Sequence, residues 1–370
     1  MRIFIAAESF FPRSNGVTNS VIRSARYARN NGHEVRILAQ GDGPIRIEDF
    51  EVVRVPALSL NKNATVDFPV VSHKRLRTVI ETYAPHVIHL ASPFFLGDQV
   101  RKTANELNIP VVAIYQTDVP GFASFYKLNF LRTYGDLKIR KIHANVDLNL
   151  VPSSASENYF ISLGITNIKR WGRGVDLQAF NPKWRSKELR AQWGNRTIVG
   201  YVGRLAPEKQ IEKLQALRDI DAQLVIIGDG PSRAALVYAL PNAIFLGQLS
   251  GEALSKAIAS LDVLVTTGEH ETFCQVVQEG MASGLPVIAP GVGGPVDLID
   301  HGSDGYLALP GNTESLRTLV EKLVSDELLR ANMGASALNR VQNKTWDAIC
   351  SELLNHYESV INRDEEQFAS

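Results

Sequence analysis

Short runs rich in β-branched residues alternate with helical patterns along most of this chain. This alternation is typical of βαβ units, in which a helix connects two parallel strands. The length of 370 residues is enough for about two domains, each with its own core. The chain is therefore predicted to be an α/β protein with two Rossmann-like, doubly wound parallel-sheet domains.

The elements are expected in two series. In the first half the strands are Arg2–Ala7, Glu34–Ala39, Val52–Pro56, Val87–Leu90, Val111–Tyr115 and Asp147–Val151, and the helices are Val17–Asn30, His73–Tyr83, Gly97–Leu107 and Ala155–Leu163. In the second half the strands are Ile198–Val202, Gln223–Ile227, Ala243–Phe245, Val263–Val265 and Pro286–Ile288, and the helices are Glu208–Leu217, Ser232–Leu240, Glu252–Ala259, Gln275–Ser283 and Glu314–Val324.

The stretch Ile168–Phe180 contains two glycines and interrupts this rhythm, so it is expected to cross between the domains. We therefore expect an N-terminal domain at residues 1–172 and a C-terminal domain at residues 173–344. The last segment, residues 345–370, has apolar residues at helical spacing over Thr345–Ile361. It is expected to be an amphipathic helix that packs on the body of the protein.

Charge is balanced overall but differs between the halves. Residues 1–172 hold 21 Lys/Arg and 14 Asp/Glu of the 39 of each, which leaves 18 and 25 for the rest, so the halves carry +7 and −7. A basic first half indicates either a surface for an anionic partner or scattered solvated charge, and both remain open. No basic motif interleaved with aromatic residues suggests nucleic acid as a partner. With two cysteines and no secretory or spanning pattern, a cytoplasmic protein is expected.

Ligands of open parallel sheets bind beyond the carboxyl ends of the strands, so the loops at those ends are the candidate sites. The loop after the first strand contains Asn15-Gly16, where the backbone can approach a phosphate or sugar closely. In the second half, Arg204 and Lys209 follow a strand and could neutralise a diphosphate without a metal. Taken singly, both are also ordinary surface charges. Two turns, Gly228–Pro231 and Gly291–Pro295, end neighbouring strands and are most simply structural.

Glu271 and Glu279 lie eight residues apart across a loop and the start of a helix expected near Gln275. An ionised carboxylate only accepts hydrogen bonds, so each could bind hydroxyls of a sugar or ribose. The backbone N–H groups of Phe273, Cys274 and Gln275 lie between them and could hold a phosphate. The alternative is an ordinary solvated first turn, in which acidic residues are favoured by the helix dipole.

The segments GRLAPEK, GDGP, EHETFCQVVQEGMASGLPVIAP and GVGGP together resemble the GT-B glycosyltransferases of the retaining family 4. The resemblance covers nearly the whole chain. It implies an acceptor-binding N-terminal domain, a C-terminal domain for the nucleotide sugar, a cleft between them and a final helix that crosses back to the first domain. It assigns the diphosphate to Arg204 and Lys209, the transferred sugar to Glu271 and the ribose to Glu279, with Gly16 facing them from the other domain.

The segments ESFFPRSNGVTNS and YQTDVPGFASFY are similar to those of GDP-mannose-dependent α-mannosyltransferases that act on membrane glycolipids. Members of the family often carry a histidine where this chain has Gln116-Thr117-Asp118. Asp118 is therefore a candidate group near the reacting carbon, or alternatively a residue that caps the next helix or turn. Asn15, Gln116 and Asp118 are the residues expected on the acceptor side.

The resemblance implies a retaining transferase that moves mannose from GDP-mannose to a lipid-linked acceptor, such as diacylglycerol glucuronic acid or a phosphatidylinositol mannoside. Such an enzyme needs no metal or other cofactor. The alternatives are a UDP-sugar-dependent transferase, a nucleotide-sugar epimerase and a nucleotide-sugar-binding sensor. No pair of carboxylates of the hydrolase type supports a glycosyl-enzyme intermediate.

A segment of the first half, Pro120–Lys141, mixes apolar and cationic side chains. Its apolar members include Phe122, Phe125, Tyr126, Phe130 and Leu131, and its cations are Lys127, Arg132, Lys138, Arg140 and Lys141. This combination suits an anionic membrane surface, although the apolar residues could instead belong to the core. The protein is therefore expected to bind peripherally at the inner face of the cell membrane.

Overall fold

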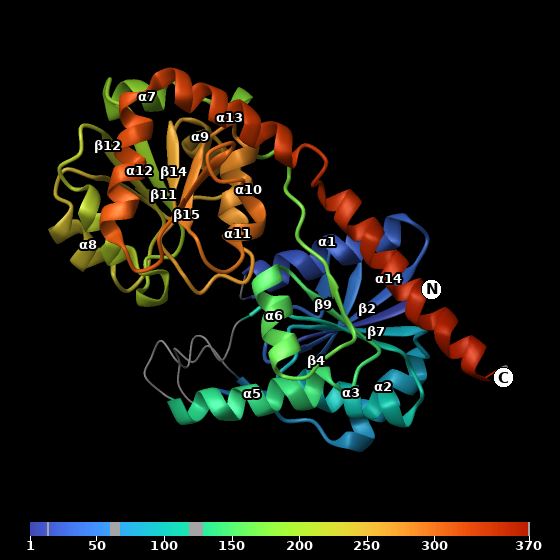
Figure 1. The fold of residues 1–370 in the computed structure, drawn as a ribbon. Helices are drawn as coiled ribbons and strands as arrows, with labels where there is room; N and C mark the ends of the chain where they lie inside the picture. The colour runs from blue at the N-terminus through green and yellow to red at the C-terminus, as the bar shows by residue number, and fades with distance from the viewer. Residues whose placement is uncertain (13–14, 60–66, 118–128, 369–370) are drawn as a thin grey trace. The chain divides into compact units, whose positions relative to one another are not determined.

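The computed structural model describes residues 1–12, 15–59, 67–117 and 129–368 (Figure 1). The chain divides into two compact units. Unit 1 comprises Met1–Arg173 and Asp347–Ser370, and unit 2 comprises Gly174–Trp346. Both are α/β units, each built on a largely parallel sheet, which confirms the predicted fold class. The predicted cleft between the two domains stays a prediction.

Unit 1 is built on an eight-stranded sheet with the order β10-β9-β8-β7-β1-β2-β4-β3. Its strands are β1 (Arg2–Ala7), β2 (Glu34–Gln40), β3 (Arg46–Ile47), β4 (Phe50–Val55), β7 (Val87–Ala91), β8 (Val111–Ile114), β9 (Leu148–Val151) and β10 (Ile168–Arg170), and a separate pair is formed by β5 (Ala57–Ser59) and β6 (Asp67–Pro69). All neighbours in the main sheet are parallel except β3 and β4. The chain reverses its direction of strand addition between β1 and β7.

Helices cover both faces of this sheet. They are α1 (Gly16–Asn30), α2 (His73–Tyr83), α3 (Leu96–Glu106), α5 (Asn129–His143), α6 (Ser154–Ser162) and α14 (Trp346–Phe368). Side chains of a strand alternate between its faces, and β1 shows the result. Ile3 and Ile5 pack with residues of α1 and α14, whereas Phe4 and Ala6 pack with residues of α2 and α3.

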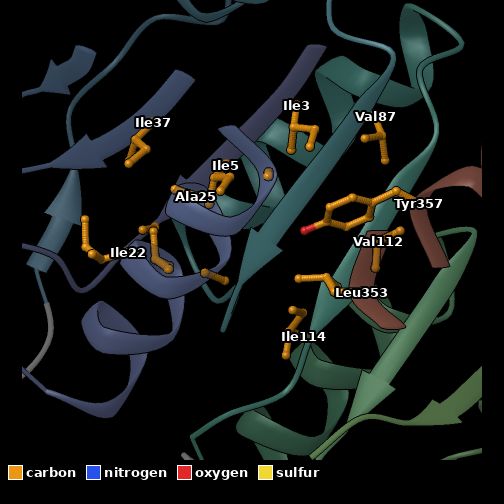
Figure 2. Packing of buried hydrophobic residues seen from close by; sticks show 14 of the residues in the cluster. Ile3, Ile5, Ile22, Ala25, Ile37, Val87, Val112, Ile114, Leu353 and Tyr357 are labelled. Atoms are coloured by element: carbon orange, nitrogen blue, oxygen red, sulfur yellow. The ribbon is translucent and has the colours of Figure 1, made fainter. Parts of the chain in front are cut away.

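The last helix, α14, belongs to the core of unit 1. Leu353 and Tyr357 of α14 lie against Ile3, Val112 and other apolar residues of the sheet (Figure 2). The Tyr357 hydroxyl lies 2.7 Å from Nδ1 of His89 on β7. Burial lowers the pKa of His89 to about 3, so its ring is neutral at neutral pH. A polar contact inside an apolar interface thus fixes where this helix sits on the sheet of unit 1.

Unit 2 has a six-stranded parallel sheet with the order β13-β12-β11-β14-β15-β16. Its strands are β11 (Ile198–Val202), β12 (Gln223–Ile227), β13 (Ile244–Gly247), β14 (Val263–Val265), β15 (Val287–Pro290) and β16 (Gly305–Ala308). Its helices are α7 (Lys187–Trp193), α8 (Arg233–Ala239), α9 (Gly251–Ala259), α10 (Gln275–Ala282), α11 (Pro295–Leu298), α12 (Thr313–Ser325) and α13 (Glu327–Val341), with 3₁₀ helices η1 (Pro182–Trp184), η2 (Pro207–Lys209) and η3 (Ile211–Leu217). The strands β11 to β13 follow one another toward one edge of the sheet and β14 to β16 toward the other, so the strand order reverses between β11 and β14.

Two sequence predictions about local structure need correction. Glu208–Leu217 was expected to be one α-helix, but it lies within the 3₁₀ helices η2 and η3. Gln210 between them adopts the left-handed conformation, with φ 50° and ψ 39°, which ends any continuous helix. Ile168–Phe180 was expected to cross between the domains, and the division after Arg173 does lie within it, but its first three residues form β10 beside β9. The structure divides the chain after Arg173 and again after Trp346.

Candidate active site

The reversal point of unit 2 is flanked by the loops that follow β11 and β14. Parallel sheets of this kind bind ligands beyond the carboxyl ends of the strands at such a point. The loop after β11 contains Arg204 and η2, and the loop after β14 leads through Glu271 to α10. The sheet order therefore brings together two loops that are about sixty residues apart in sequence.

Glycine turns hold these loops in close contact. A Cβ atom on Gly228 would lie 1.9 Å from the Gly203 carbonyl oxygen, and one on Gly230 would lie 2.3 Å from that of Leu205. Only residues without a side chain allow these backbones to approach so closely. The turn after β12 thus supports the backbone that carries Arg204.

A second pair of glycines supports the loop that carries Glu271. A Cβ on Gly293 would lie 2.6 Å from the Glu271 carbonyl oxygen, and one on Gly294 would lie 2.4 Å from Cα of Phe273. The Gly294 N–H also donates to the Glu271 carbonyl oxygen at 2.7 Å. The position of Glu271 therefore depends on backbone packing, and its side chain remains available for other contacts.

Lys209 and Glu271 form an ion pair across this point of the sheet. Their side chains are 30% and 18% exposed, so the pair is partly shielded from water. Burial alone would lower the pKa of Lys209, but the adjacent Glu271 carboxylate outweighs it and raises this pKa above its usual value. The Thr267 hydroxyl donates to the Lys209 carbonyl oxygen at 2.7 Å, which fixes the backbone of Lys209.

Arg204 is more exposed than Lys209. Its guanidinium lies 3.4 Å from a Glu208 carboxylate oxygen, and its side chain is 59% exposed. The Tyr201 hydroxyl donates to the Arg204 carbonyl oxygen at 3.2 Å. The backbone is thus held while the cationic group, close to Glu208, reaches into solvent, where an anion could recruit it.

The start of α10 presents unused backbone donors. Cys274 is its N-cap, in the left-handed conformation with φ 72°, and its side chain makes no capping bond. No acceptor for the N–H groups of Phe273, Cys274 and Gln275 is found among the described residues. Burial raises the pKa of the Cys274 thiol well above its ordinary value, so it stays protonated and inert. These three N–H groups are therefore available to donate to an anionic group.

Glu279 lies on the second turn of α10 and is partly buried. Its carboxylate has no hydrogen-bond donor or cation as a partner within the described part of the chain. Burial raises its pKa from 4.5 to about 7. A carboxylate left in this state is suited to accept hydrogen bonds from the hydroxyls of a ligand.

In unit 1, the structure brings Asn15, Gly16 and Gln116 together around Arg173. The Asn15 side chain caps α1 by accepting from Val17 N–H at 2.9 Å. The Arg173 guanidinium donates to Gln116 Oε1 at 2.8 Å, and a Cβ on Gly16 would lie 2.5 Å from Nη1 of Arg173. Asp118, the other residue expected here, lies outside the described residues.

Sequence reasoning missed Arg173 and the role of Glu8 in this unit. Arg173 was read only as part of the crossing segment, although a cation beside two glycines could have been a signal. The Glu8 carboxylate accepts from the N–H groups of Phe94, Phe95 and Gly97 at 2.5, 2.9 and 2.9 Å. It fills the N-terminus of α3, which follows β7 at the reversal point of this sheet.

No set of three or more His, Cys, Asp or Glu side chains that could hold a metal occurs in the described ranges. The same part of the chain contains no helix with the length and apolar character of a membrane span.

Comparisons with known proteins agree with this architecture. The model of Glycosyltransferase Family 4 matches residues 14–179, and that of Glycosyl transferases group 1 matches residues 183–340. A solved structure of the Anabaena protein Alr3699/HepE in complex with UDP-glucose superposes with a TM-score of 0.78 at 20% identity, over 97% of this chain and 100% of that one. The fold is that of the GT-B glycosyltransferases.

Proteins similar in sequence indicate the family within this fold. A GDP-mannose-dependent alpha-mannosyltransferase of Corynebacterium glutamicum is 43% identical, over 98% of this chain and 89% of that protein. One with the same name from Mycobacterium tuberculosis is 43% identical over 100% and 99%. Sulfoquinovosyl transferase SQD2 of Arabidopsis thaliana is 32% identical over 95% and 72%. The chain belongs to glycosyltransferase family 4, as the sequence resemblance predicted.

The unpartnered Glu279 generates a testable prediction about stability. Below about pH 4.5 the carboxyl group is protonated in both the folded and the unfolded chain. As pH rises toward 7 the unfolded chain releases the proton first, so the folded state loses stability until its own pKa is passed. Glu279→Gln should therefore stabilise the protein by roughly 1–3 kcal/mol at about pH 8, less where water reaches the group.

Thermal unfolding of the wild type and of Glu279→Gln at about pH 8 and pH 4.5 measures this effect. The gain should be large at the higher pH and much smaller at the lower one, where the group is still half protonated in the unfolded chain. A variant that is no more stable than the wild type at pH 8 would show that Glu279 has a partner in solution.

Proposed function

We propose that this protein is a retaining glycosyltransferase that transfers mannose from GDP-mannose to a membrane glycolipid. The observation that carries the proposal is the cluster of Arg204, the Lys209–Glu271 pair and the open N–H groups of α10 at one reversal point. The donor and the transferred sugar are supported by the 43% identity to GDP-mannose-dependent α-mannosyltransferases. Relatives named for phosphatidylinositol dimannoside and glucosyldiacylglycerol also support a lipid acceptor.

In the proposed reaction the diphosphate of the donor binds Lys209, Arg204 and the N–H groups at the start of α10. These groups stabilise the charge that develops on the leaving diphosphate, so that no metal is required. Glu271 then exchanges its bond to Lys209 for hydroxyls of the mannose, and Glu279 accepts from the ribose. Retention of configuration follows if the acceptor hydroxyl attacks from the side of the leaving group, with a phosphate oxygen taking its proton.

Arg204→Ala should lower kcat with GDP-mannose by roughly 10²–10³, because it removes one preorganised charge from the leaving group. Arg218→Ala is the matched control, since Arg218 is an exposed arginine of the same unit and should be dispensable. A chelator should leave the wild-type rate unchanged. Full activity of Arg204→Ala, or loss of activity with chelator, would contradict the assignment. The same assay with UDP-mannose and without acceptor distinguishes a UDP-dependent enzyme and an epimerase.

We further propose that unit 1 binds peripherally to anionic membrane through α5. Tyr134 and Leu137 of this helix are 51% and 62% exposed. Arg140 and Lys141 are also exposed. They follow Tyr134 and Leu137 by three to seven residues, which places the four side chains on one face of the helix. Apolar groups beside cations are what an interfacial helix needs. This attachment would place the protein at the inner face of the membrane, beside a lipid acceptor.

Part of the predicted membrane segment needs correction. Lys138 was expected to face lipid, but its side chain is only 16% exposed and lies 3.9 Å from Asp98. Its ammonium also lies over the Phe95 ring, 4.9 Å from the centroid. Ile139 is 2% exposed and belongs to the core, as the alternative interpretation allowed. Residues 118–128, with three of the predicted aromatic side chains, lie outside the described residues, as do the side chains of Phe130 and Leu131.

Co-sedimentation with vesicles tests the membrane proposal. Binding should rise with the fraction of anionic lipid, fall with salt, and weaken several-fold in Arg140→Ser/Lys141→Ser. The control is Lys74→Ser/Arg75→Ser, which removes two exposed cations from α2 of the same unit and should bind normally. Equal recovery with neutral and anionic vesicles, or equal loss in both double variants, would contradict docking through α5.

A further inference from the structure

A second ion pair lies beside the Lys209–Glu271 pair in unit 2. Lys213 of η3 pairs with Glu269, so the lysines are four residues apart and the carboxylates two residues apart. The Lys213 and Glu269 side chains are 17% and 21% exposed. Neither residue was predicted to belong to the site.

The second pair is anchored more firmly than the first. Glu269 Oε1 also accepts from the Gly311 N–H at 2.7 Å, and the Lys213 ammonium also donates to Gln210 Oε1 at 2.8 Å. It therefore joins η3, the loop after β14 and the loop after β16. Burial raises the pKa of Glu269, but Lys213 and the Gly311 N–H together lower it below its usual value, so the carboxylate is charged at neutral pH.

Glu269 therefore places a second negative charge close to the proposed diphosphate site. The stem of Lys209 passes directly by this loop, because a Cβ on Gly268 would lie 3.6 Å from both Cα and Cδ of Lys209. The same Cβ would lie 3.4 Å from Glu271 Oε1. A carboxylate at residue 269 that lost its own cation would compete with Glu271 and with a phosphate for Lys209.

We propose that Lys213 is a positioning residue that neutralises Glu269, so that Lys209 has one exchangeable partner, Glu271, and remains available to the donor diphosphate. This inference rests on the proposed function. The Lys209–Glu271 pair opens when the donor binds, whereas the Lys213–Glu269 pair stays closed and holds the loop. Lys213 acts through Glu269 and Lys209 and does not itself touch the donor.

The proposal predicts an asymmetry that a purely structural ion pair would not show. Lys213→Met leaves a bare carboxylate beside the site, so it should weaken GDP-mannose binding and raise KM about tenfold or more. The kcat at saturating donor should change less than about threefold. Glu269→Gln removes the charge and keeps an acceptor for Gly311, so it should bind the donor within about threefold of the wild type. Adding Glu269→Gln to Lys213→Met should restore most of the binding.

Calorimetric titration of GDP-mannose into the four proteins, with kcat and KM, tests the proposal. Lys256→Met, which breaks the exposed Glu252 pair of α9, is the matched control and should bind like the wild type. The proposal would be overturned if Lys213→Met and Glu269→Gln weakened donor binding equally and additively. It would also be overturned if Lys213→Met left donor binding unchanged. If Lys213→Met does not fold, Lys213→Arg and the double variant Lys213→Met/Glu269→Gln decide. Both should bind GDP-mannose normally, and weak binding by either would overturn the proposal. A wild type that binds no GDP-mannose would instead refute the proposed function.

Discussion

Close backbone contact between glycine turns at the carboxyl edge of the unit 2 sheet is the constraint on which the candidate active site depends. The turns after β12 and β15 press against the loops after β11 and β14 at distances that no Cβ would allow. Because β11 and β14 are neighbours at the reversal point, Lys209 and Glu271 meet although sixty-two residues separate them. The scaffold fixes the backbone of each residue and leaves the charged ends to exchange partners.

The site contains both paired and unpaired charged groups, and the two kinds affect stability differently. The Lys209–Glu271 pair is self-neutralising, so neither charge is left without a partner before a donor binds. Glu279 has no such partner, and its raised pKa measures the cost of keeping an acceptor ready. The backbone N–H groups at the start of α10 also lack a partner among the described residues, since the Cys274 side chain makes no capping bond. The site thus combines one exchangeable ion pair with several groups that only a ligand would satisfy.

Much of this could be predicted from the sequence, because the relevant signals are local. The strands β1, β11, β12 and β14 and the helix α2 have the predicted bounds, since β-branched runs and turn residues mark their ends. The loops of the site were found because they follow strands and therefore share one edge of the sheet. A helix at Glu208–Leu217 was predicted wrongly, because helical spacing of apolar residues does not reveal a left-handed residue at Gln210. Lys213–Glu269, Arg173–Gln116 and Lys138–Asp98 join residues 40 to 57 positions apart, and spacing carries no signal for such contacts.

A crystal structure of the protein with bound GDP-mannose tests the central claim most directly. In unit 2 the Lys209 ammonium should contact a diphosphate oxygen, and the Glu271 carboxylate should accept from a hydroxyl of mannose. Lys213 should remain paired with Glu269. A donor bound elsewhere, or bound at this edge of the sheet while Lys209 and Glu271 stay paired with each other, would contradict the account.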